Sequence, residues 1–222
     1  MAFFANFKKS AAELKTLPCL CITAVLIALD LAIKAAPFLS IQVTDDLKIS
    51  FAFVAVAAIG MLYGPTVAGL ACVVTDVIGY MIKPVGGFSP LFTLVEVAGG
   101  VIYGCFLYNF SPVKLDFSGG KAFGRSLCDN IFGVLRIAAA KITVAVVCNL
   151  LMTPLFLTIQ KTMEAGTFNA QVFWVGFCTR VGSRVIKNLI EVPLHVMILL
   201  VVLFPIMSAY NLAFGRRRKT VG

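Results

Sequence analysis

Charged side chains are scarce in this sequence. Asp, Glu, Lys and Arg together make up 13% of the 222 residues, about half of the ~25% that is usual in soluble domains. Apolar residues make up 60%, and the mean hydropathy is +0.98. A soluble domain of this size cannot bury so much apolar surface. The composition excludes a disordered chain and a small disulfide scaffold, and it predicts a protein that is embedded in a lipid bilayer.

Residues for metal and covalent chemistry are equally scarce. The chain has one histidine, His195, and its seven cysteines show no spacing typical of a metal site. It has no phosphate-binding G-x-x-x-x-G-K-[ST] loop, no H-E-x-x-H and no G-x-S-x-G motif. We expect the cysteines to act as small apolar side chains. The sequence therefore predicts a protein that is not an enzyme, holds no metal or cofactor and does not itself hydrolyse ATP.

The net charge of +9 is concentrated near the two ends of the chain. Lys8, Lys9 and Lys15 cluster near the beginning, and residues 216–219 consist of three arginines and a lysine. Basic clusters beside membrane spans are typical of the cytoplasmic side and of contact with anionic lipid. We therefore expect the lipid bilayer, and not nucleic acid, to be the partner of these charges.

Hydropathy predicts an all-α integral membrane protein with six transmembrane helices in one bundle. The whole chain, 1–222, is expected to form this single domain, with short basic tails at about 1–15 and 215–222. Residues 42–48 and 160–171 are expected to be loops. The six expected spans cover residues 17–38, 49–63, 65–82, 91–108, 142–159 and 192–214.

Positive charge is distributed unequally between the two sides of this predicted bundle. The tails and the loop after the fourth span carry ten Lys and Arg residues, whereas the loops after the first, third and fifth spans carry three. Loops rich in Lys and Arg remain in the cytoplasm. Both termini are therefore predicted to be cytoplasmic.

A polar stripe precedes and enters the last span. At 100° per residue, its six members fall within an arc of about 100° on one helix face. Charges at membrane depth are costly, so they face a cavity or a partner. One hypothesis is a pocket open to the outside that selects an anionic ligand; the alternative is an interfacial helix whose cations reach lipid headgroups. The stripe consists of Arg180, Arg184, Lys187, Asn188, Glu191 and His195.

Acidic and aromatic side chains elsewhere in the spans are further candidates for ligand binding. Asp76 lies in the middle of the third span with Tyr80 one turn later, and Glu96 lies in the fourth span. Acids within a membrane either serve a function or pair with a cation from another helix. Phe88 and Phe92 flank an expected external loop, where they would stack on a planar ligand or belong to the aromatic belt at the interface.

Two further spacings bear on helix packing. Ala24-x-x-x-Ala28 in the first span and Gly100-x-x-x-Gly104 in the fourth present small residues four apart, which let another helix approach closely. Asp30 and Lys34, also in the first span, form an i,i+4 pair of opposite charge that we expect to neutralise itself locally.

An ordered succession of segments resembles a known family. In order and spacing it is similar to the substrate-binding (S) components of energy-coupling factor (ECF) vitamin transporters, most of all to their folate-specific branch. Residues 55, 152 and 156 depart from that branch's pattern, so an S component for another vitamin or precursor, or a membrane protein without a transport role, remains the alternative. The matching segments are 47–53 (LKISFAF), 60–65 (GMLYGP), 76–80 (DVIGY), 88–94 (FSPLFTL), 100–104 (GVIYG) and 183–188 (SRVIKN).

The resemblance implies a multi-pass protein of the bacterial cell membrane that binds its vitamin from outside with high affinity. It also implies a transmembrane coupling protein (T component) and two ATP-binding-cassette ATPases as partners. In the family, the small-residue row of the first helix contacts the coupling protein, and this row maps to Ala24 and Ala28.

For folate, the resemblance and the polar stripe point to the same helix. Arg184, Lys187 and Asn188 match the family's last-helix motif, with Arg180 as an alternative match, and arginine forks suit the two carboxylates of the glutamate tail. Phe88, Phe92 and Tyr80 would then flank the pterin ring. An acid such as Asp76 would accept hydrogen bonds from pterin N–H groups, with Glu96 and Glu191 as the other acidic candidates.

Overall fold

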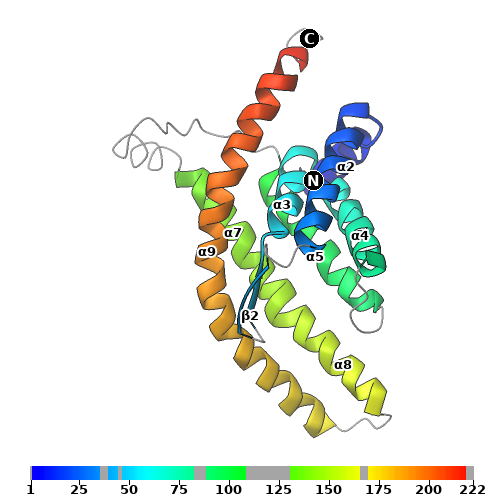
Figure 1. Cartoon of the computed structure of the whole chain (residues 1–222), viewed down its shortest axis with the longest axis vertical. Coiled ribbons are helices and arrows are strands. Elements are labelled where there is room, and N and C mark those ends of the chain that lie inside the picture. The colour runs from blue at the N-terminus through cyan, green and yellow to red at the C-terminus, as the bar shows by residue number, and fades with distance from the viewer. Residues whose placement is uncertain are drawn as a thin grey trace.

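The computed structural model describes residues 2–35, 40–44, 47–82, 89–108, 131–165 and 170–218, and helices make up most of this part of the chain. In Figure 1, α9 follows one side of the molecule along its whole length, and α8 and the first half of α9 extend below the ends of α4 and α5. The elements in chain order are α1 (Ala2–Glu13), α2 (Leu17–Ala35), β1 (Ser40–Thr44), β2 (Leu47–Ser50), α3 (Phe53–Tyr63), α4 (Pro65–Ile82), α5 (Pro90–Leu107), α7 (Ile131–Val144), the π-helical segment η2 (Ala145–Met152), α8 (Thr153–Ala165) and α9 (Ala170–Arg218).

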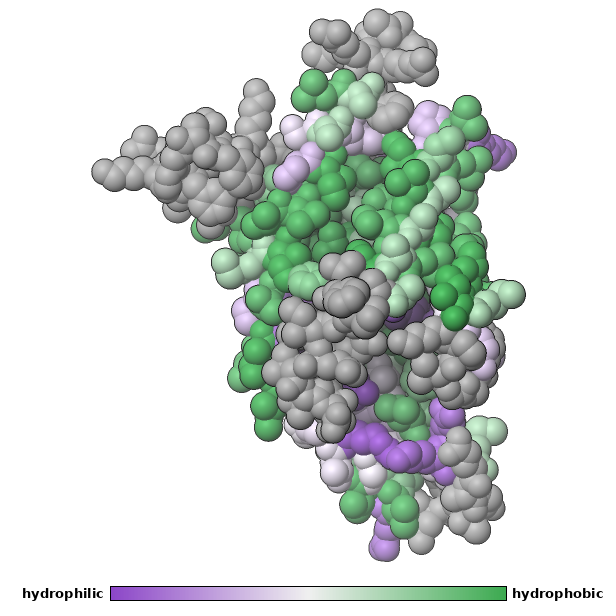
Figure 2. Space-filling view, viewed as in Figure 1, coloured by the Kyte–Doolittle hydropathy of each residue, from purple (hydrophilic) through white to green (hydrophobic). Residues whose placement is uncertain are grey.

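Five segments of the described chain are long and apolar enough to cross a membrane. The predicted helical membrane fold is thus confirmed, although one of the expected spans, α3, has only 11 residues. Figure 2 shows hydrophobic residues over much of the upper half of the visible face, while strongly hydrophilic residues gather toward its lower end. The five segments are Leu17–Ala35, Pro65–Ile82, Pro90–Leu107, Ile131–Met163 and Gln171–Ala213.

A β-hairpin replaces the loop that was expected at 42–48 and shortens the second expected span. β1 and β2 pair antiparallel, with Ser40 opposite Ser50 and Ile41 opposite Ile49. Both segments alternate polar and apolar residues, a period of two that suits a strand and not a helix. The helix therefore begins at Phe53 and not near residue 49, and a short hairpin stands where a loop was expected within an otherwise helical fold.

The expected N-terminal tail is largely a helix, α1, that packs against the beginning of α4. The Ser10 hydroxyl is fully buried; it donates to Tyr63 O over 2.6 Å and accepts from the backbone N–H groups of Thr66 and Val67 at 3.1 and 3.2 Å. The first N–H groups of a helix have no partner within the helix, and a serine oxygen is a preferred acceptor for them. Ser10 thus caps α4 from a distant part of the chain.

The last two long helical segments also extend beyond their expected limits. α7, η2 and α8 follow one another without a break, and α9 begins at Ala170, so only 166–169 lie between them, where a loop of 160–171 was expected. Pro154 has no N–H to donate, and the hydroxyl of Thr153 donates to Cys148 O at 2.7 Å. This arrangement is consistent with the local widening into a π-helix.

Close contacts between glycines and neighbouring helices hold the centre of the bundle together. A Cβ atom added at Gly104 would lie 2.4 Å from Pro65 Cα, and one added at Gly100 would lie 2.6 Å from the Cys72 sulfur. The Gly100-x-x-x-Gly104 prediction of close helix approach is therefore confirmed, with α4 as the partner of α5. α3 lies in this centre and is buried on all sides from Ala55 to Tyr63, which explains why its sequence is apolar all round.

Candidate functional site

A cavity of about 380 Å³ lies among α2, α3, α5, α7, η2 and α9, and we call it the main cavity. Its size is within the range of ~300–1,000 Å³ that is usual for small-molecule sites. Apolar side chains such as Phe53, Val56 and Val95 form part of its wall. The polar side chains that line it are Asp30, Lys34, Glu96, Tyr103, Lys141, Asn149, Glu191 and His195.

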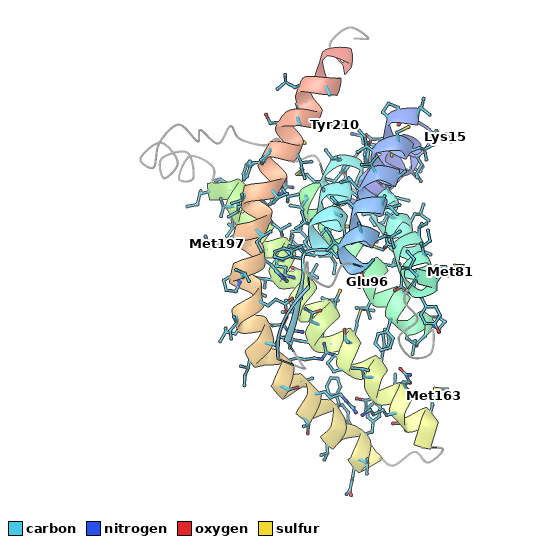
Figure 3. The ribbon with its side chains drawn as sticks, viewed as in Figure 1. Lys15, Met81, Glu96, Met163, Met197 and Tyr210 are labelled. Carbon is cyan, nitrogen blue, oxygen red and sulfur yellow. The ribbon has the colours of Figure 1, made fainter. Side chains whose placement is uncertain are left out.

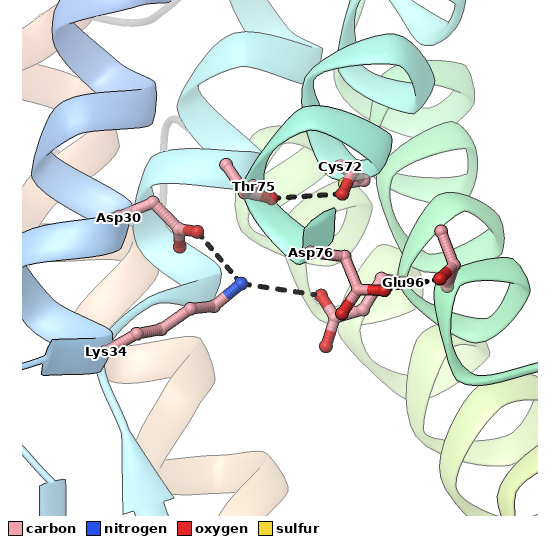
Figure 4. A network of polar contacts seen from close by, with 7 residues as sticks. Asp30, Lys34, Cys72, Thr75, Asp76 and Glu96 are labelled. Atoms are coloured by element: carbon pink, nitrogen blue, oxygen red, sulfur yellow. Dashed lines mark hydrogen bonds and ion pairs between the residues drawn. The ribbon is translucent and has the colours of Figure 1, made fainter. Parts of the chain in front are cut away.

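An ion-pair cluster lines one side of the main cavity (Figure 4). Lys34 Nζ lies 2.9 Å from Asp30 Oδ2 and 4.0 Å from Glu96 Oε2. The Asp30 carboxylate is almost completely buried, and a buried charge in a membrane requires an opposite charge beside it. In Figure 3, Glu96 lies near the middle of the view, with Met81 and Met197 toward its two edges; the Glu96 side chain is 47% exposed. Asp30 and Lys34 pair as expected, but Lys34 also connects α2 to α5.

A second cavity, of about 270 Å³, lies on the other side of Lys34 and Glu96, which line both cavities. Asp76 and Tyr80 line this second cavity together with Thr75. The hydroxyl of Thr93, on α5, donates a short hydrogen bond to Asp76 Oδ2. Asp76 is therefore already engaged within the protein.

The α9 side of the main cavity combines an acid, an imidazole and an aromatic ring. His195 is 2% exposed, and its ring centroid lies 3.9 Å from that of Phe53 at an interplanar angle of 35°. Its Nδ1 lies 3.4 Å from Glu191 Oε1. Lys141 Nζ lies 5.1 Å from the centroid of the same Phe53 ring, and a cation at this distance is attracted by the ring. A planar polar ligand would meet both apolar and hydrogen-bonding partners here.

The polar stripe of α9 faces the interior of the protein over several turns. Asn188 is buried and accepts a hydrogen bond from Asn149 Nδ2 at 3.0 Å, and Arg180 Nη1 donates to the Thr158 hydroxyl at 2.8 Å. The intervening positions on the opposite face are exposed and apolar. They include Val185, Ile186, Leu189, Ile190 and Leu194. The stripe is thus one continuous inner face of α9. Cations that bind lipid headgroups would instead point outward from the protein.

The structure brings together part of the predicted site. Glu96 and Glu191 line the main cavity, whereas Asp76 and Tyr80 line the second cavity. Phe92 is half-buried on α5 and lines neither cavity, and Phe88 lies outside the described residues. Of the stripe, Arg180, Arg184, Lys187 and Asn188 continue along α9 away from the main cavity, which they do not line.

Three charged residues of the main cavity lie outside the set predicted from the sequence to bind a ligand. The sequence pairs Asp30 and Lys34 only with each other, and it does not single out Lys141. The argument used for Asp76 applies to them as well. Any ionisable side chain in an apolar span costs free energy, which marks it as a candidate site residue. Among the described residues, no group of His, Cys, Asp and Glu is placed to hold a metal ion.

The comparisons with known proteins decide the family. The model of the substrate-specific component of ECF transporters matches residues 19–203. The chain belongs to this family. The membership inferred from the ordered motifs is therefore confirmed, and this S component is a multi-pass membrane protein whose family serves as the substrate-binding part of a transporter and not as an enzyme.

Two curated relatives and one solved structure are similar to this S component. The folate transporter FolT of Clostridium novyi (strain NT) is 50% identical over 72 residues, which are 32% of this chain and 41% of the relative. FolT of Leuconostoc mesenteroides is 28% identical over 153 residues, 69% of each chain. The S component thus spans less than half of the first relative. A crystal structure of FolT bound with folic acid shares 29% identity with a TM-score of 0.57, covering 83% of this chain and 91% of that chain.

Proposed function

We propose that this S component binds folate with high affinity and delivers it to an ECF transporter. The observation that carries the proposal is the likeness, over most of the chain, to a FolT structure that holds folic acid. The main cavity supports it, because it combines aromatic walls with acids, amides and cations. Such a cavity suits a ligand that has a flat hydrogen-bonding ring at one end and carboxylates at the other.

Six crossings form the bundle in this proposal, within one domain. Five of them are the long apolar segments, and the additional, short crossing is α3. At ~1.5 Å per residue α3 is about 16 Å long, roughly half of the ~30 Å core of a bilayer. A short crossing is tolerated here because α3 is buried among other helices and exposes little backbone to lipid. Both termini lie in the cytoplasm, and the end of the molecule where α8 and α9 meet faces outside.

The stripe supplies the site for the ligand's carboxylates. From His195 to Arg180, fifteen residues apart, the stripe extends over about 22 Å at ~1.5 Å per residue. It therefore leads from the main cavity toward the outer end of α9. Arg184 and Lys187 bind the carboxylates, supported by Arg180 and Asn188, because charged donors make the stronger hydrogen bonds to carboxylates.

The flat ring of folate lies deeper than its carboxylates in this arrangement. Phe53, in the wall of the main cavity, flanks it. Tyr80 lines the second cavity and Phe92 lines neither cavity, so in this arrangement these two of the expected aromatic partners lie away from the ring. One of the acids of the site accepts hydrogen bonds from the ring's N–H groups; the candidates are Asp76, Glu96 and Glu191.

Transport requires partners in this proposal. The chain lacks an ATP-binding motif, so two ABC ATPases supply the energy through a T component. Ala24 and Ala28 are both exposed on the outer face of α2. This row of small side chains lets a helix of the T component pack closely against α2.

The identity of the ligand is tested by extracting and identifying the small molecules that are bound to the purified protein. We expect mass spectrometry of extracts from the detergent-purified S component to detect a folate, and calorimetric titration with folic acid to show saturable binding. Riboflavin and thiamine serve as controls and should not bind. A different vitamin in the extract, with no heat on addition of folic acid, would reject the folate assignment while keeping the transporter role.

A further inference from the structure

Four acidic side chains lie around the two cavities, and three of them are already engaged by cations or hydroxyl groups of the protein. Asp30 pairs with Lys34 at 2.9 Å, and the same ammonium lies 4.0 Å from Glu96. Asp76 accepts a hydrogen bond from Thr93. Glu191 differs from them, because the ionisable group beside it is the imidazole of His195, whose Nδ1 lies 3.4 Å from Glu191 Oε1.

Beside Glu191, the main cavity contains buried polar atoms that have no hydrogen-bond partner among the described residues. These are the Tyr103 hydroxyl, both ring nitrogens of His195 and the two carboxylate oxygens of Asp30, one of which, Oδ2, has the Lys34 ammonium beside it at 2.9 Å. Tyr103 and His195 are each 2% exposed, and both line the main cavity. A buried polar group without a partner costs free energy, and such groups are rare in native proteins unless a ligand or water satisfies them. Together they indicate a place where a bound molecule supplies the missing hydrogen bonds.

From this arrangement we infer that Glu191 is the acid that recognises the aminopyrimidine edge of the ligand's pterin ring, with Tyr103 and His195 as further hydrogen-bonding partners. The inference rests on the proposed function and assigns the orientation of the ligand. The pterin lies against α5 and α9 in the main cavity, and the glutamate tail follows the stripe toward Arg184.

The chemistry of the two partners is complementary. In a 2-amino-4-oxopteridine, the ring N3–H and the 2-amino group are adjacent donors that point in the same direction. A carboxylate presents two acceptor oxygens that match such a pair, and bonds to an ionised acceptor are about twice as strong as neutral ones. The Lys141 ammonium lines the same cavity and is available as a donor to the 4-oxo oxygen. Phe53, against which His195 stacks, supplies an apolar surface for the ring.

Titration of purified variants with folic acid and with pteroic acid, which keeps the pterin but lacks the glutamate, tests the inference. Glu191→Gln replaces one acceptor oxygen by an amide that would oppose a ligand donor. We expect its affinity for both ligands to fall by the same factor, about ten- to hundredfold. Arg184→Ala provides the contrast, since its loss should be confined to folic acid.

Tyr103→Phe is the second test, because it removes only a hydroxyl that has no hydrogen-bond partner in the described part of the chain. We expect the thermal unfolding temperature of the free protein to be unchanged or slightly raised, while affinity for both ligands falls. Matched controls are Glu13→Gln and Tyr108→Phe, which change a distant pair linked by a hydrogen bond from Tyr108 to Glu13. Both controls should bind as the unchanged protein does.

The outcomes separate the two levels of the proposal. If the unchanged protein does not bind folic acid, the proposed function itself fails. If it binds folic acid and both Glu191→Gln and Tyr103→Phe retain full affinity, this inference is wrong and the proposed function stands. A loss in Glu191→Gln for folic acid but not for pteroic acid would place Glu191 at the glutamate end and would likewise overturn the inference. Should Glu191→Gln not fold, Tyr103→Phe decides alone.

Discussion

Asn149 donates a hydrogen bond from Nδ2 to Asn188 Oδ1 over 3.0 Å and so connects the π-helical segment η2 to the polar stripe of α9. Asn188 in turn donates to the backbone oxygen of Arg184 at 2.9 Å. Asn149 lines the main cavity, whereas Arg184 lies one turn farther along α9. The pair thus joins the cavity to the part of the stripe that we assign to carboxylates. π-helical turns are frequent at functional sites, and this one places an amide at the edge of the cavity.

The role of Arg184 in binding carboxylates is tested by substitution. We expect Arg184→Ala to weaken folate binding by about 1.5–3 kcal/mol, roughly ten- to hundredfold, because a charge-assisted hydrogen bond is lost. Arg184→Lys should recover only part of the loss, since an ammonium cannot form a two-pronged contact. Calorimetry of the purified variants measures the effect, with the exposed Arg136→Ala as control. Unchanged affinity in Arg184→Ala and Lys187→Ala together would refute the assignment of this face.

The outer face of α2 is tested by separating binding from uptake. We expect Ala24→Trp or Ala28→Trp to leave folate binding intact and to abolish folate uptake by cells, because a bulky side chain prevents close approach of a partner helix. Leu189→Trp is the control, since Leu189 is 77% exposed on α9, on a different helix. Equal loss of binding and uptake in the alanine variants would argue against a docking role.

The orientation in the membrane is tested by labelling single cysteines placed in tags at each end of the chain. The ten-to-three excess of Lys and Arg predicts that both tags react only with a membrane-permeant reagent in intact cells. A cysteine placed at Lys161 in α8 is expected to react with the impermeant reagent from outside. Labelling of either terminus by the impermeant reagent would rule out this topology.

Close helix packing at Gly104 is tested through stability. A Cβ at this position would lie 2.4 Å from Pro65 Cα and 2.5 Å from Pro65 N, which are backbone atoms that cannot move without shifting a helix. We expect Gly104→Ala to destabilise the protein by about 1–3 kcal/mol or more. Gly182→Ala is the matched control, because nothing lies within 4 Å of its added Cβ, and it should be neutral or stabilising by up to about 1 kcal/mol. Thermal unfolding in detergent compares the two variants.

The buried ion pair of α2 is tested by removing its two charges separately and together. Lys34→Met leaves the Asp30 carboxylate buried without its cation, and we expect a loss of about 3–5 kcal/mol in the free energy of unfolding. The double variant Asp30→Asn/Lys34→Met should recover much of this loss, because no isolated charge remains. Lys161→Met, at an exposed position, is the control. If the double variant is as unstable as Lys34→Met, the cost does not arise from the unpaired charge.

Several features of this protein were determined by the sequence alone, because they depend only on local periodicity. The six members of the polar stripe share one helix face in the sequence and in the structure. Pro65 begins a helix as expected, and Gly100 and Gly104 permit the close approach that their spacing predicted. Helical periodicity assigns residues to a face without reference to neighbours, so these predictions did not require knowledge of the tertiary fold.

Other features were decided only by the tertiary structure. Three contacts depend on which helix faces meet. They are the hydrogen bonds of Ser10 at the start of α4, the contact of Lys34 with Glu96, and the position of Lys141 in the main cavity. Hydropathy does not encode this choice, because lipid tails are as apolar as the interior of a helix bundle and both attract the same side chains. The sequence therefore predicted that charged residues within the membrane require partners, and the packing of α2, α5, α7 and α9 decided which partners they have.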